Sequence, residues 1–227
     1  MLLECKELRF TYPDSSANVL NNLCFALHEP GFNAVFGPSG AGKTSLAKII
    51  AGSIAASEGE ITTEGISSIL YSCNLERLPG WATLTQHLDA VAPPGKKELR
   101  HDLIEVFGLR NLMQAKFSQL SLGQRNRINL LRYLLQDFDL LIMDESLANV
   151  DEKLRETIIL HIKQCFSDKM FLCISHNLLE VAKFCKEIVV LLDGSGCRVL
   201  HGLDCRQHYV LDKSKLDAVM LEIMNAC

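Results

Sequence analysis

An apolar run that leads into a glycine-rich loop constrains this chain more than any other feature. The run Phe32-Asn33-Ala34-Val35-Phe36 is followed by Gly37-Pro38-Ser39-Gly40-Ala41-Gly42-Lys43-Thr44. The run is typical of a short buried strand, and residues 43–51 are typical of a helix that stops at Gly52. The spacing fits G-x-x-x-x-G-K-[ST], the phosphate-binding loop of nucleotide triphosphatases, in the strand–loop–helix setting that this motif requires.

The residue types in this phosphate loop (residues 37–44) suit an anionic ligand. Glycines allow the backbone N–H groups to converge on one phosphate chain. The helix that begins at Lys43 adds unpaired N–H groups and the positive end of its dipole. We therefore expect Lys43 to reach the β- and γ-phosphates and the Thr44 hydroxyl to bind Mg²⁺.

Composition excludes several classes of protein. The 227 residues suit one large domain, or one domain with a subdomain. The net charge of −4, with scattered basic residues, predicts no nucleic-acid surface. The nine cysteines have no C-x-x-C spacing, so we expect neither a disulfide framework nor a zinc site. No signal peptide or apolar run of roughly 18 residues is present, which predicts a chain of the reducing cytoplasm that does not span a membrane.

Elsewhere, strand and helix patterns alternate. Strands are expected at residues 8–12, 19–27, 59–65 (as a hairpin strand), 138–143, 170–175, 188–192 and 197–200, and helices at 154–166, 178–185 and 211–224. From about residue 93 to residue 135 the apolar spacing is helical throughout. This alternation predicts an α/β fold with a mostly parallel sheet.

A second motif closes one of the expected strands. The apolar run Leu140-Leu141-Ile142-Met143 ends in Asp144-Glu145. In a phosphate-loop protein, an aspartate at such a strand end can hold Mg²⁺. The neighbouring glutamate points to a different face and is placed to orient and deprotonate a water molecule.

A third motif makes a family resemblance specific. The segment Leu120-Ser121-Leu122-Gly123-Gln124 follows the helical region. With the other motifs in order, the chain resembles an ATP-binding-cassette (ABC) ATPase subunit of a transporter over nearly its whole length. The resemblance implies a single ABC ATPase domain, residues 1–227. A P-loop NTPase (RecA-like) core with an antiparallel β part would take residues 1–74 and 136–227, and a helical subdomain carrying the signature would take residues 75–135.

The resemblance also implies residue roles. Tyr12 matches the adenine-stacking aromatic, and residues 120–124 match the LSGGQ signature. Glu145 matches the catalytic base, residues 149–151 (Asn149-Val150-Asp151) match the D-loop, and His176 matches the switch histidine that contacts the γ-phosphate. The ATP-binding residues so implied are Tyr12, Gly37, Ser39, Gly40, Ala41, Gly42, Lys43, Thr44, Ser45, Asn74, Ser121, Gly123, Gln124 and Asp151; the metal ligands are Thr44, Asp144 and Asn74.

Three positions depart from the family pattern. Leu122 replaces a signature glycine, and a positive φ there would cost leucine about 1–2 kcal/mol. In the family, a glutamine of the Q-loop contacts the metal and the membrane partner. Here Asn74 aligns with that glutamine, and Cys73 is the alternative alignment. Asparagine keeps the amide oxygen on a shorter side chain. Ser146 stands where the family usually has proline.

The resemblance implies Mg²⁺ and ATP as cofactors. It also implies a head-to-tail pair with a second cassette, homomeric or heteromeric, and a separate transmembrane permease that would hold this cytoplasmic chain at the inner face of the cell membrane. The segment Leu78-Pro79-Gly80-Trp81-Ala82-Thr83-Leu84 resembles importer subunits of the nitrate, sulfonate and taurine type. Two alternatives are a weakly hydrolysing, regulatory cassette of an asymmetric complex and a soluble ABC ATPase without a transport role.

Overall fold

The computed structural model describes residues 1–13, 17–73, 76, 79–93, 95–192, 196–207 and 212–226. Along these residues the elements are β1 (Leu2–Phe10), β2 (Leu20–Leu27), β3 (Gly31–Phe36), α1 (Lys43–Ile50), β4 (Glu58–Glu64), β5 (Ile69–Cys73), α2 (Leu84–Val91), α3 (Lys97–Val106), α4 (Leu122–Leu134), β6 (Leu140–Asp144), α5 (Glu152–Cys165), β7 (Met170–Ile174), α6 (Leu178–Phe184), β8 (Glu187–Leu191), β9 (Cys197–His201) and α7 (Lys213–Ala226). The short 3-10 turns η1 (Arg110–Leu112) and η2 (Phe117–Gln119) lie between α3 and α4.

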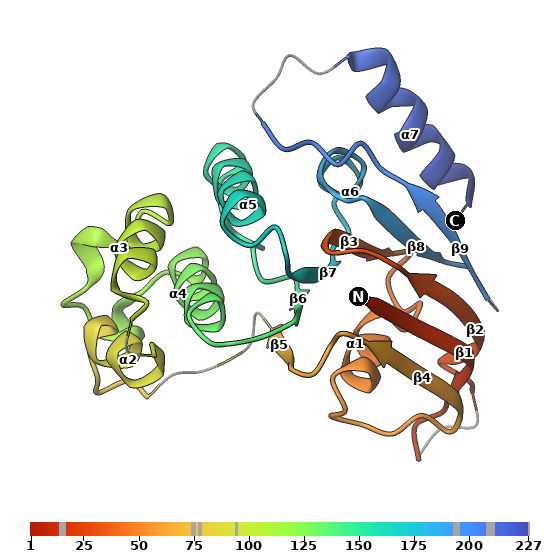
Figure 1. The fold of residues 1–227 in the computed structure, drawn as a ribbon, viewed down its shortest axis with the longest axis horizontal. Coiled ribbons are helices and arrows are strands. Elements are labelled where there is room, and N and C mark those ends of the chain that lie inside the picture. Colours follow the sequence, from red (N-terminus) through yellow and green to blue (C-terminus); the bar gives the residue numbers. More distant parts are fainter. Residues whose placement is uncertain are drawn as a thin grey trace.

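The strands form two sheets (Figure 1). The larger sheet has the order β5-β6-β7-β3-β8-β9, in which all neighbours are parallel except the antiparallel pair β8 and β9. Parallel neighbours need long crossover connections, which the helices supply. The smaller sheet, β2-β1-β4, is antiparallel.

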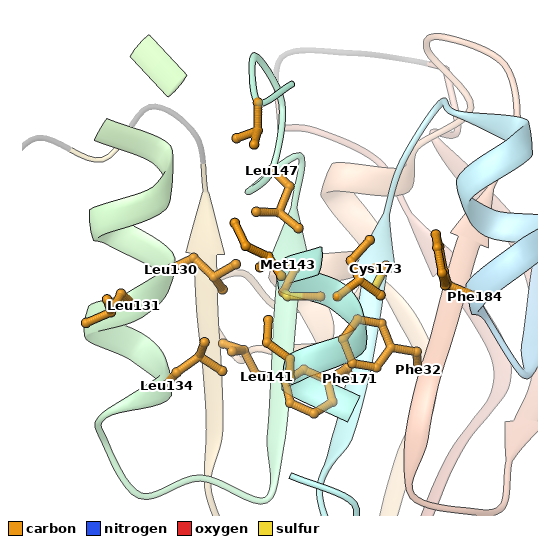
Figure 2. Close-up of a cluster of buried hydrophobic side chains, with 14 of the residues drawn as sticks. Phe32, Leu130, Leu131, Leu134, Leu141, Met143, Leu147, Phe171, Cys173 and Phe184 are labelled. Carbon is orange, nitrogen blue, oxygen red and sulfur yellow. The ribbon is translucent and has the colours of Figure 1, made fainter. Parts of the chain in front are cut away.

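Each face of the larger sheet has its own hydrophobic cluster, because successive strand residues point to opposite faces. In β3, Val35 joins the cluster formed with α1 and the small sheet, whereas Ala34 joins the cluster formed with helices α2 to α7. Figure 2 shows leucines of α4 beside Leu141 and Met143 of β6. A buried leucine contributes about 1.5–3 kcal/mol, so this apolar contact fastens α4 to the edge of the sheet.

The expected fold class is confirmed, while several element boundaries differ. The hairpin expected at residues 59–65 is wrong in its pairing: β4 pairs with β1, with Thr62 opposite Glu4. The strand expected at residues 8–12 begins at Leu2 and ends at Phe10. The sequence reading did not include β5 or α2, although a capping box between Thr83 and Gln86 marks the start of α2. Residues 193–195, between the strands expected at 188–192 and 197–200, fall outside the described residues.

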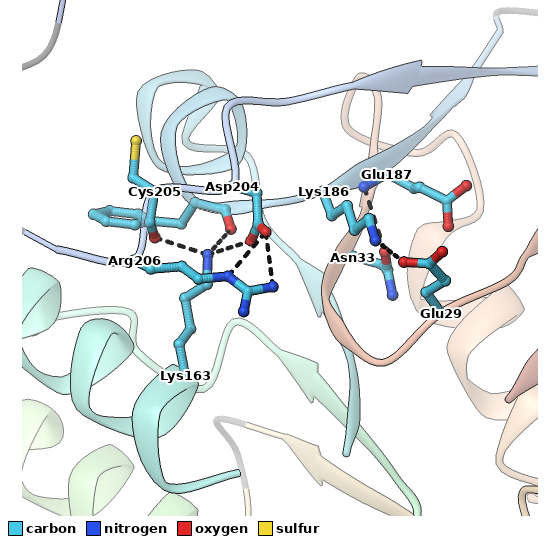
Figure 3. A network of polar contacts seen from close by, with 9 residues as sticks. Glu29, Asn33, Lys163, Lys186, Glu187, Asp204, Cys205 and Arg206 are labelled. Carbon is cyan, nitrogen blue, oxygen red and sulfur yellow. Dashed lines mark hydrogen bonds and ion pairs between the residues drawn. The ribbon is translucent and has the colours of Figure 1, made fainter. Parts of the chain in front are cut away.

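A buried lysine ties the segment after β9 to the core (Figure 3). The Lys163 ammonium on α5 donates to the Phe184 and Cys205 carbonyls at 2.7 and 2.8 Å and to Asp204 Oδ1 at 2.6 Å. A buried charge is stable only when it is paired and hydrogen-bonded in this way. The network fixes residues 204–206 against α5 and α6.

No described helix combines the length and the apolar character that crossing a membrane requires.

Candidate nucleotide-binding site

The phosphate loop joins β3 to α1 and has the backbone that its glycines predict. Gly40 and Gly42 have φ values of 86° and 88°, in the left-handed region that favours glycine. A Cβ at Gly42 would lie 2.6 Å from a Leu20 side-chain carbon and 2.9 Å from the Val19 carbonyl, so the loop also needs glycine for space. The Lys43 ammonium donates to the carbonyls of Gly37 and Pro38 at 2.8 and 2.7 Å, and its charge therefore lies over the loop.

The first turn of α1 carries Thr44 on its exposed side and Ser45 on its buried side. This turn contains no acidic residue, so the positive end of the helix dipole is not neutralised locally. The Tyr12 hydroxyl lies 3.0 Å from Ser45 Oγ, and its ring packs edge-on against Phe10. Tyr12 remains 41% exposed beside the phosphate loop, so one ring is available at this edge of the site.

The carboxyl ends of four parallel strands form one row at the loop. Cys73 of β5 is paired with Asp144 of β6, Asp144 with Ile174 of β7, and Ile174 with Val35 of β3. In open α/β sheets, ligands bind in the crevice outside the carboxyl ends of the strands. The predicted loop, the two carboxylates and the histidine therefore meet at the edge where a ligand is expected.

Asp144 is only 8% exposed and is held by a contact that sequence reasoning missed. Tyr71, in β5, donates its hydroxyl proton to Asp144 Oδ2 at 2.8 Å. Burial and the Asp144 carboxylate raise the pKa of Tyr71, so its hydroxyl keeps the proton that it donates. The other carboxylate oxygen of Asp144 and the exposed Thr44 hydroxyl are oxygen donors of the kind that Mg²⁺ prefers. The described residues of the predicted metal site therefore fit that ion.

Glu145 has a backbone conformation that is unusual for its type. Its φ is 52°, and its N–H donates to the Ile174 carbonyl at 3.1 Å, which fixes it to the end of β7. Its Oε1 lies 3.2 Å from Nδ1 of His176, whose side chain is 75% exposed. Residues held in sparsely populated backbone regions cluster at functional sites. The structure thus brings together the two residues that were predicted to be catalytic.

A cavity of about 440 Å³ lies behind this pair, between the two strand ends and helices α5 and α6. Its wall includes Glu145, His176, Arg155 and Glu180. Burial raises the pKa of Glu180, against the opposing effect of Arg155 3.4 Å away. No residue of the phosphate loop lines this cavity, so the cavity borders the candidate site at Glu145 and His176.

The signature segment begins α4. Ser121 is the N-cap: its hydroxyl accepts from the Gln124 N–H at 3.3 Å, while Gln124 Oε1 accepts from the Ser121 N–H at 2.9 Å. Leu122 is the first helical residue, is 62% exposed, and is not among the described residues with positive φ. The strain considered for Leu122 is therefore absent, because a residue in the first turn of an α-helix has the ordinary helical φ.

Gly123 is needed for a different reason. A Cβ there would lie 2.2 Å from the carbonyl oxygen of Asn149 in the D-loop. Asn126, one turn later in α4, donates to the Ala148 carbonyl at 2.7 Å. The signature and the D-loop of the same chain are therefore in backbone contact, whereas Figure 1 shows α4 and α1 on opposite sides of β5.

The remaining predicted residues have local partners or fall outside the described residues. Asp151 is the N-cap of α5 and accepts from the Leu154 N–H at 2.9 Å. Asn74 lies outside the described residues, whereas Cys73 ends β5 opposite Asp144. Ser146, in place of proline, donates to the Ser72 carbonyl at 3.0 Å, and its hydroxyl lies 3.1 Å from that of Ser72. The serine thus ties the start of the loop after β6 to β5.

Sequence reasoning also missed a carboxylate that follows β5. Glu76 Oε1 pairs with Arg132 at 3.0 Å, and Oε2 accepts from the Tyr133 hydroxyl at 2.7 Å. Its carbonyl accepts from Asn129 at 3.1 Å. Three contacts thus attach this residue to α4, and no local pattern in the sequence indicates a pairing across this separation.

Comparison with known proteins identifies the family. A family model described as ABC transporter matches residues 20–148. The thiamine import ATP-binding protein ThiQ of Escherichia coli (strain K12) is 31% identical over 180 residues, which cover 71% of this chain and 77% of ThiQ. The taurine import ATP-binding protein TauB of Pseudomonas entomophila is 30% identical over 232 residues, which cover 94% of this chain and 88% of TauB.

Solved structures agree on the fold. The structure of an ATP-binding subunit of an ABC transporter superposes with a TM-score of 0.80 at 23% identity, covering 99% of this chain and 100% of that one. A dimeric ATP-binding cassette bound to ADP and Pi superposes with a TM-score of 0.74 at 22% identity, covering 91% and 100%. Motifs, fold and relatives agree: the chain belongs to the ABC transporter family, as an ATP-binding cassette ATPase.

Proposed function

We propose that this chain is the ATP-hydrolysing subunit of an ABC importer that works with a separate transmembrane permease. The observation that carries the proposal is the row of strand ends at which the phosphate loop, Asp144, Glu145 and His176 meet. The names of ThiQ and TauB, both described as import ATP-binding proteins, support the direction of transport.

The phosphate loop binds the triphosphate in this proposal. Backbone N–H groups of residues 37–44 and the first turn of α1 surround the phosphates, and Lys43 exchanges its carbonyl partners for phosphate oxygens. Tyr12 stacks on the adenine from the neighbouring edge, where its ring is exposed. Ser45 supports Tyr12 through the contact between their hydroxyls.

The proposed metal ligands are Thr44 and Asp144, with Asn74 as the third candidate. Bound there, Mg²⁺ would neutralise charge on the β- and γ-phosphates. Tyr71 orients the Asp144 carboxylate by occupying one of its oxygens. Outer-shell hydrogen bonds of this kind keep a ligand in the conformation that binding needs.

Glu145 is the proposed general base. It lies at the strand end next to Asp144 and accepts a proton from the attacking water as the water approaches the γ-phosphate. His176 lies at hydrogen-bond distance from this carboxylate and restricts where it points. The left-handed backbone at Glu145 directs the residue away from the extended path of β6.

A second cassette completes the site. Ser121 and Leu122 are exposed at the start of α4, and the first N–H groups of a helix have no partner within it. Since α4 and α1 lie on opposite sides of β5, these groups suit a nucleotide held by another subunit (Figure 1). Ser121, Gly123, Gln124 and Asp151 would then serve the partner's ATP in a head-to-tail pair.

The permease contact is proposed for the segment around Trp81, on the cytoplasmic face of the membrane. The Trp81 side chain is 78% exposed, and tryptophan is enriched where proteins bind partners. In the sequence it stands between Glu76, which contacts α4, and the start of α2 at Leu84. A contact at this segment would reach the signature helix directly.

Affinity purification from detergent-solubilised native membranes tests the proposal. The tagged chain should recover a polytopic membrane protein in stoichiometric amount, and Trp81→Ala should reduce that recovery. Leu221→Ala, which alters an exposed side chain on α7, is the matched control and should not. Recovery of soluble partners alone would overturn the transport role and favour a cassette ATPase without a permease.

A further inference from the structure

Three side chains from two helices converge on one point away from the nucleotide site. Asp102 of α3 places Oδ2 2.8 Å from Nε2 of His161 on α5, and Cys165, one turn later on α5, places Sγ 3.3 Å from the same nitrogen. All three donor atoms lie within 4.8 Å of one another. A nitrogen, a sulfur and a carboxylate oxygen form the type of donor set that holds a transition metal.

One imidazole nitrogen faces both other ligand atoms of this group. A neutral imidazole nitrogen carries either one proton or one lone pair. If Nε2 carries the proton, it donates to the Asp102 carboxylate at 2.8 Å, and the Cys165 sulfur at 3.3 Å competes for the same proton. If Nε2 carries the lone pair, it faces the carboxylate of Asp102 and the two repel. A cation between the three atoms would satisfy all of them.

We propose that Asp102, His161 and Cys165 form a zinc site that joins α3 to α5. In a tetrahedral zinc site, ligand atoms lie about 3.3–3.6 Å apart, so Nε2 would move apart from the Asp102 oxygen by about half an ångström and from the Cys165 sulfur by less. His161 and Cys165 are four residues apart and share one face of α5. Thiolate and imidazole ligands select zinc over Mg²⁺ or Ca²⁺.

The site is open to solvent on one side. Asp102 and Cys165 are exposed, whereas the His161 side chain is 18% exposed, so the ion has an entry path and water can take the fourth position. Without the ion, burial and the Asp102 carboxylate raise the pKa of the Cys165 thiol. Binding therefore replaces the S–H bond with a zinc–sulfur bond and releases one proton to the buffer.

A bound ion would cross-link the region of residues 75–135 to the core. Asp102 lies in that region, whereas His161 and Cys165 lie on α5, which packs with the sheet. The phosphate loop supplies none of the three ligands, so Zn²⁺ binding can be measured without nucleotide. It also departs from the expectation of no zinc site, because C-x-x-C spacing cannot reveal ligands that come from two distant helices.

Titration of the purified, nucleotide-free full chain with Zn²⁺ and with Co²⁺ tests the site. The wild-type protein should bind one ion, release a proton, show a thiolate-to-Co²⁺ charge-transfer band and unfold at a higher temperature with Zn²⁺. Cys165→Ser should abolish the band. It should also weaken binding by at least about 100-fold, since even lost outer-shell contacts cost roughly 10–100-fold.

Two further variants make the result decisive. Asp102→Asn, at an exposed position, should weaken Zn²⁺ binding while the Co²⁺–thiolate band persists at saturation. Cys24→Ser removes another exposed cysteine and should bind like the wild type. Equal Zn²⁺ affinity in the wild type and Cys165→Ser, or no stoichiometric binding, would overturn the site and leave a hydrogen-bonded triad.

Discussion

A Cβ at Gly123 would lie 2.2 Å from the carbonyl oxygen of Asn149, so the signature and the D-loop of this chain touch backbone to backbone. Asn149 itself has a φ of 60°, in the left-handed region that is uncommon for residues other than glycine. Asn126 secures the same junction through the Ala148 carbonyl. A displacement of the D-loop must therefore move the start of α4, or the contact breaks.

We expect Gly123→Ala to destabilise the fold by about 1–3 kcal/mol, because the new methyl group would overlap a backbone atom rather than a flexible side chain. Urea denaturation measures the loss. Leu122→Ala is the matched control, since that side chain is 62% exposed, and it should change stability by no more than about 0.5 kcal/mol. Equal stability of Gly123→Ala and the wild type would contradict the contact.

Leu122→Gly should not stabilise the protein. Leu122 starts α4 without a positive φ, so glycine relieves no backbone strain there. Glycine should instead cost up to about 1 kcal/mol through its lower helix propensity. Thermal unfolding of the purified variant checks the sign. A rise in stability would restore the idea that leucine is strained at this position.

Local motifs in the sequence correctly predicted the strands and the helix of the candidate nucleotide-binding edge, but they did not predict the long-range contacts. The strand–loop–helix around Lys43 and the strand that ends at Asp144 follow from residue patterns within a few positions. The bond between Tyr71 and Asp144, in contrast, joins residues 73 positions apart. The pairing of β4 with β1 was missed for the same reason, because periodicity predicts a strand without naming its partner.

The contribution of Asp139 to the free energy of unfolding should depend on pH. Its Oδ2 accepts from the N–H groups of Ser67 and Ser68 at 2.8 and 3.1 Å, and these bonds, with Lys169, hold its pKa below the ordinary 3.8. A carboxylate whose pKa is lowered by folding stabilises the fold at pH values above its pKa in the unfolded chain. This stabilisation is lost as the pH falls through its pKa in the folded protein.

Asp139→Asn should therefore cost about 1 kcal/mol at neutral pH, with screening of the partly exposed charge taken into account. The difference from the wild type should shrink as the pH is lowered below the ordinary carboxyl pKa of 3.8, because the wild-type carboxylate then begins to protonate. Urea denaturation at neutral pH and along a series of falling pH values measures it. Asp217→Asn, on an exposed face of α7, is the control. A difference that grows as the pH falls would refute the assignment.

Glu145→Gln should keep ATP binding and lower ATP turnover by about 10²–10⁴-fold, because the amide cannot accept the proton of the attacking water. Glu152→Gln is the matched control, since that glutamate is exposed in the first turn of α5. Steady-state phosphate release and equilibrium binding of a labelled nucleotide separate the two effects. Turnover that is unchanged in Glu145→Gln would assign the base role to another residue.

Tyr71→Phe should raise the Mg²⁺ concentration needed for half-maximal ATP turnover by roughly 10–100-fold, the usual cost of removing an outer-shell contact. The hydroxyl of Tyr71 fixes the Asp144 carboxylate at 2.8 Å, and without it the carboxylate must be ordered when the ion binds. Tyr133→Phe removes a hydroxyl that binds Glu76 instead, so it should leave the Mg²⁺ dependence unchanged. An identical Mg²⁺ dependence in both variants would show that Tyr71 does not act through Asp144.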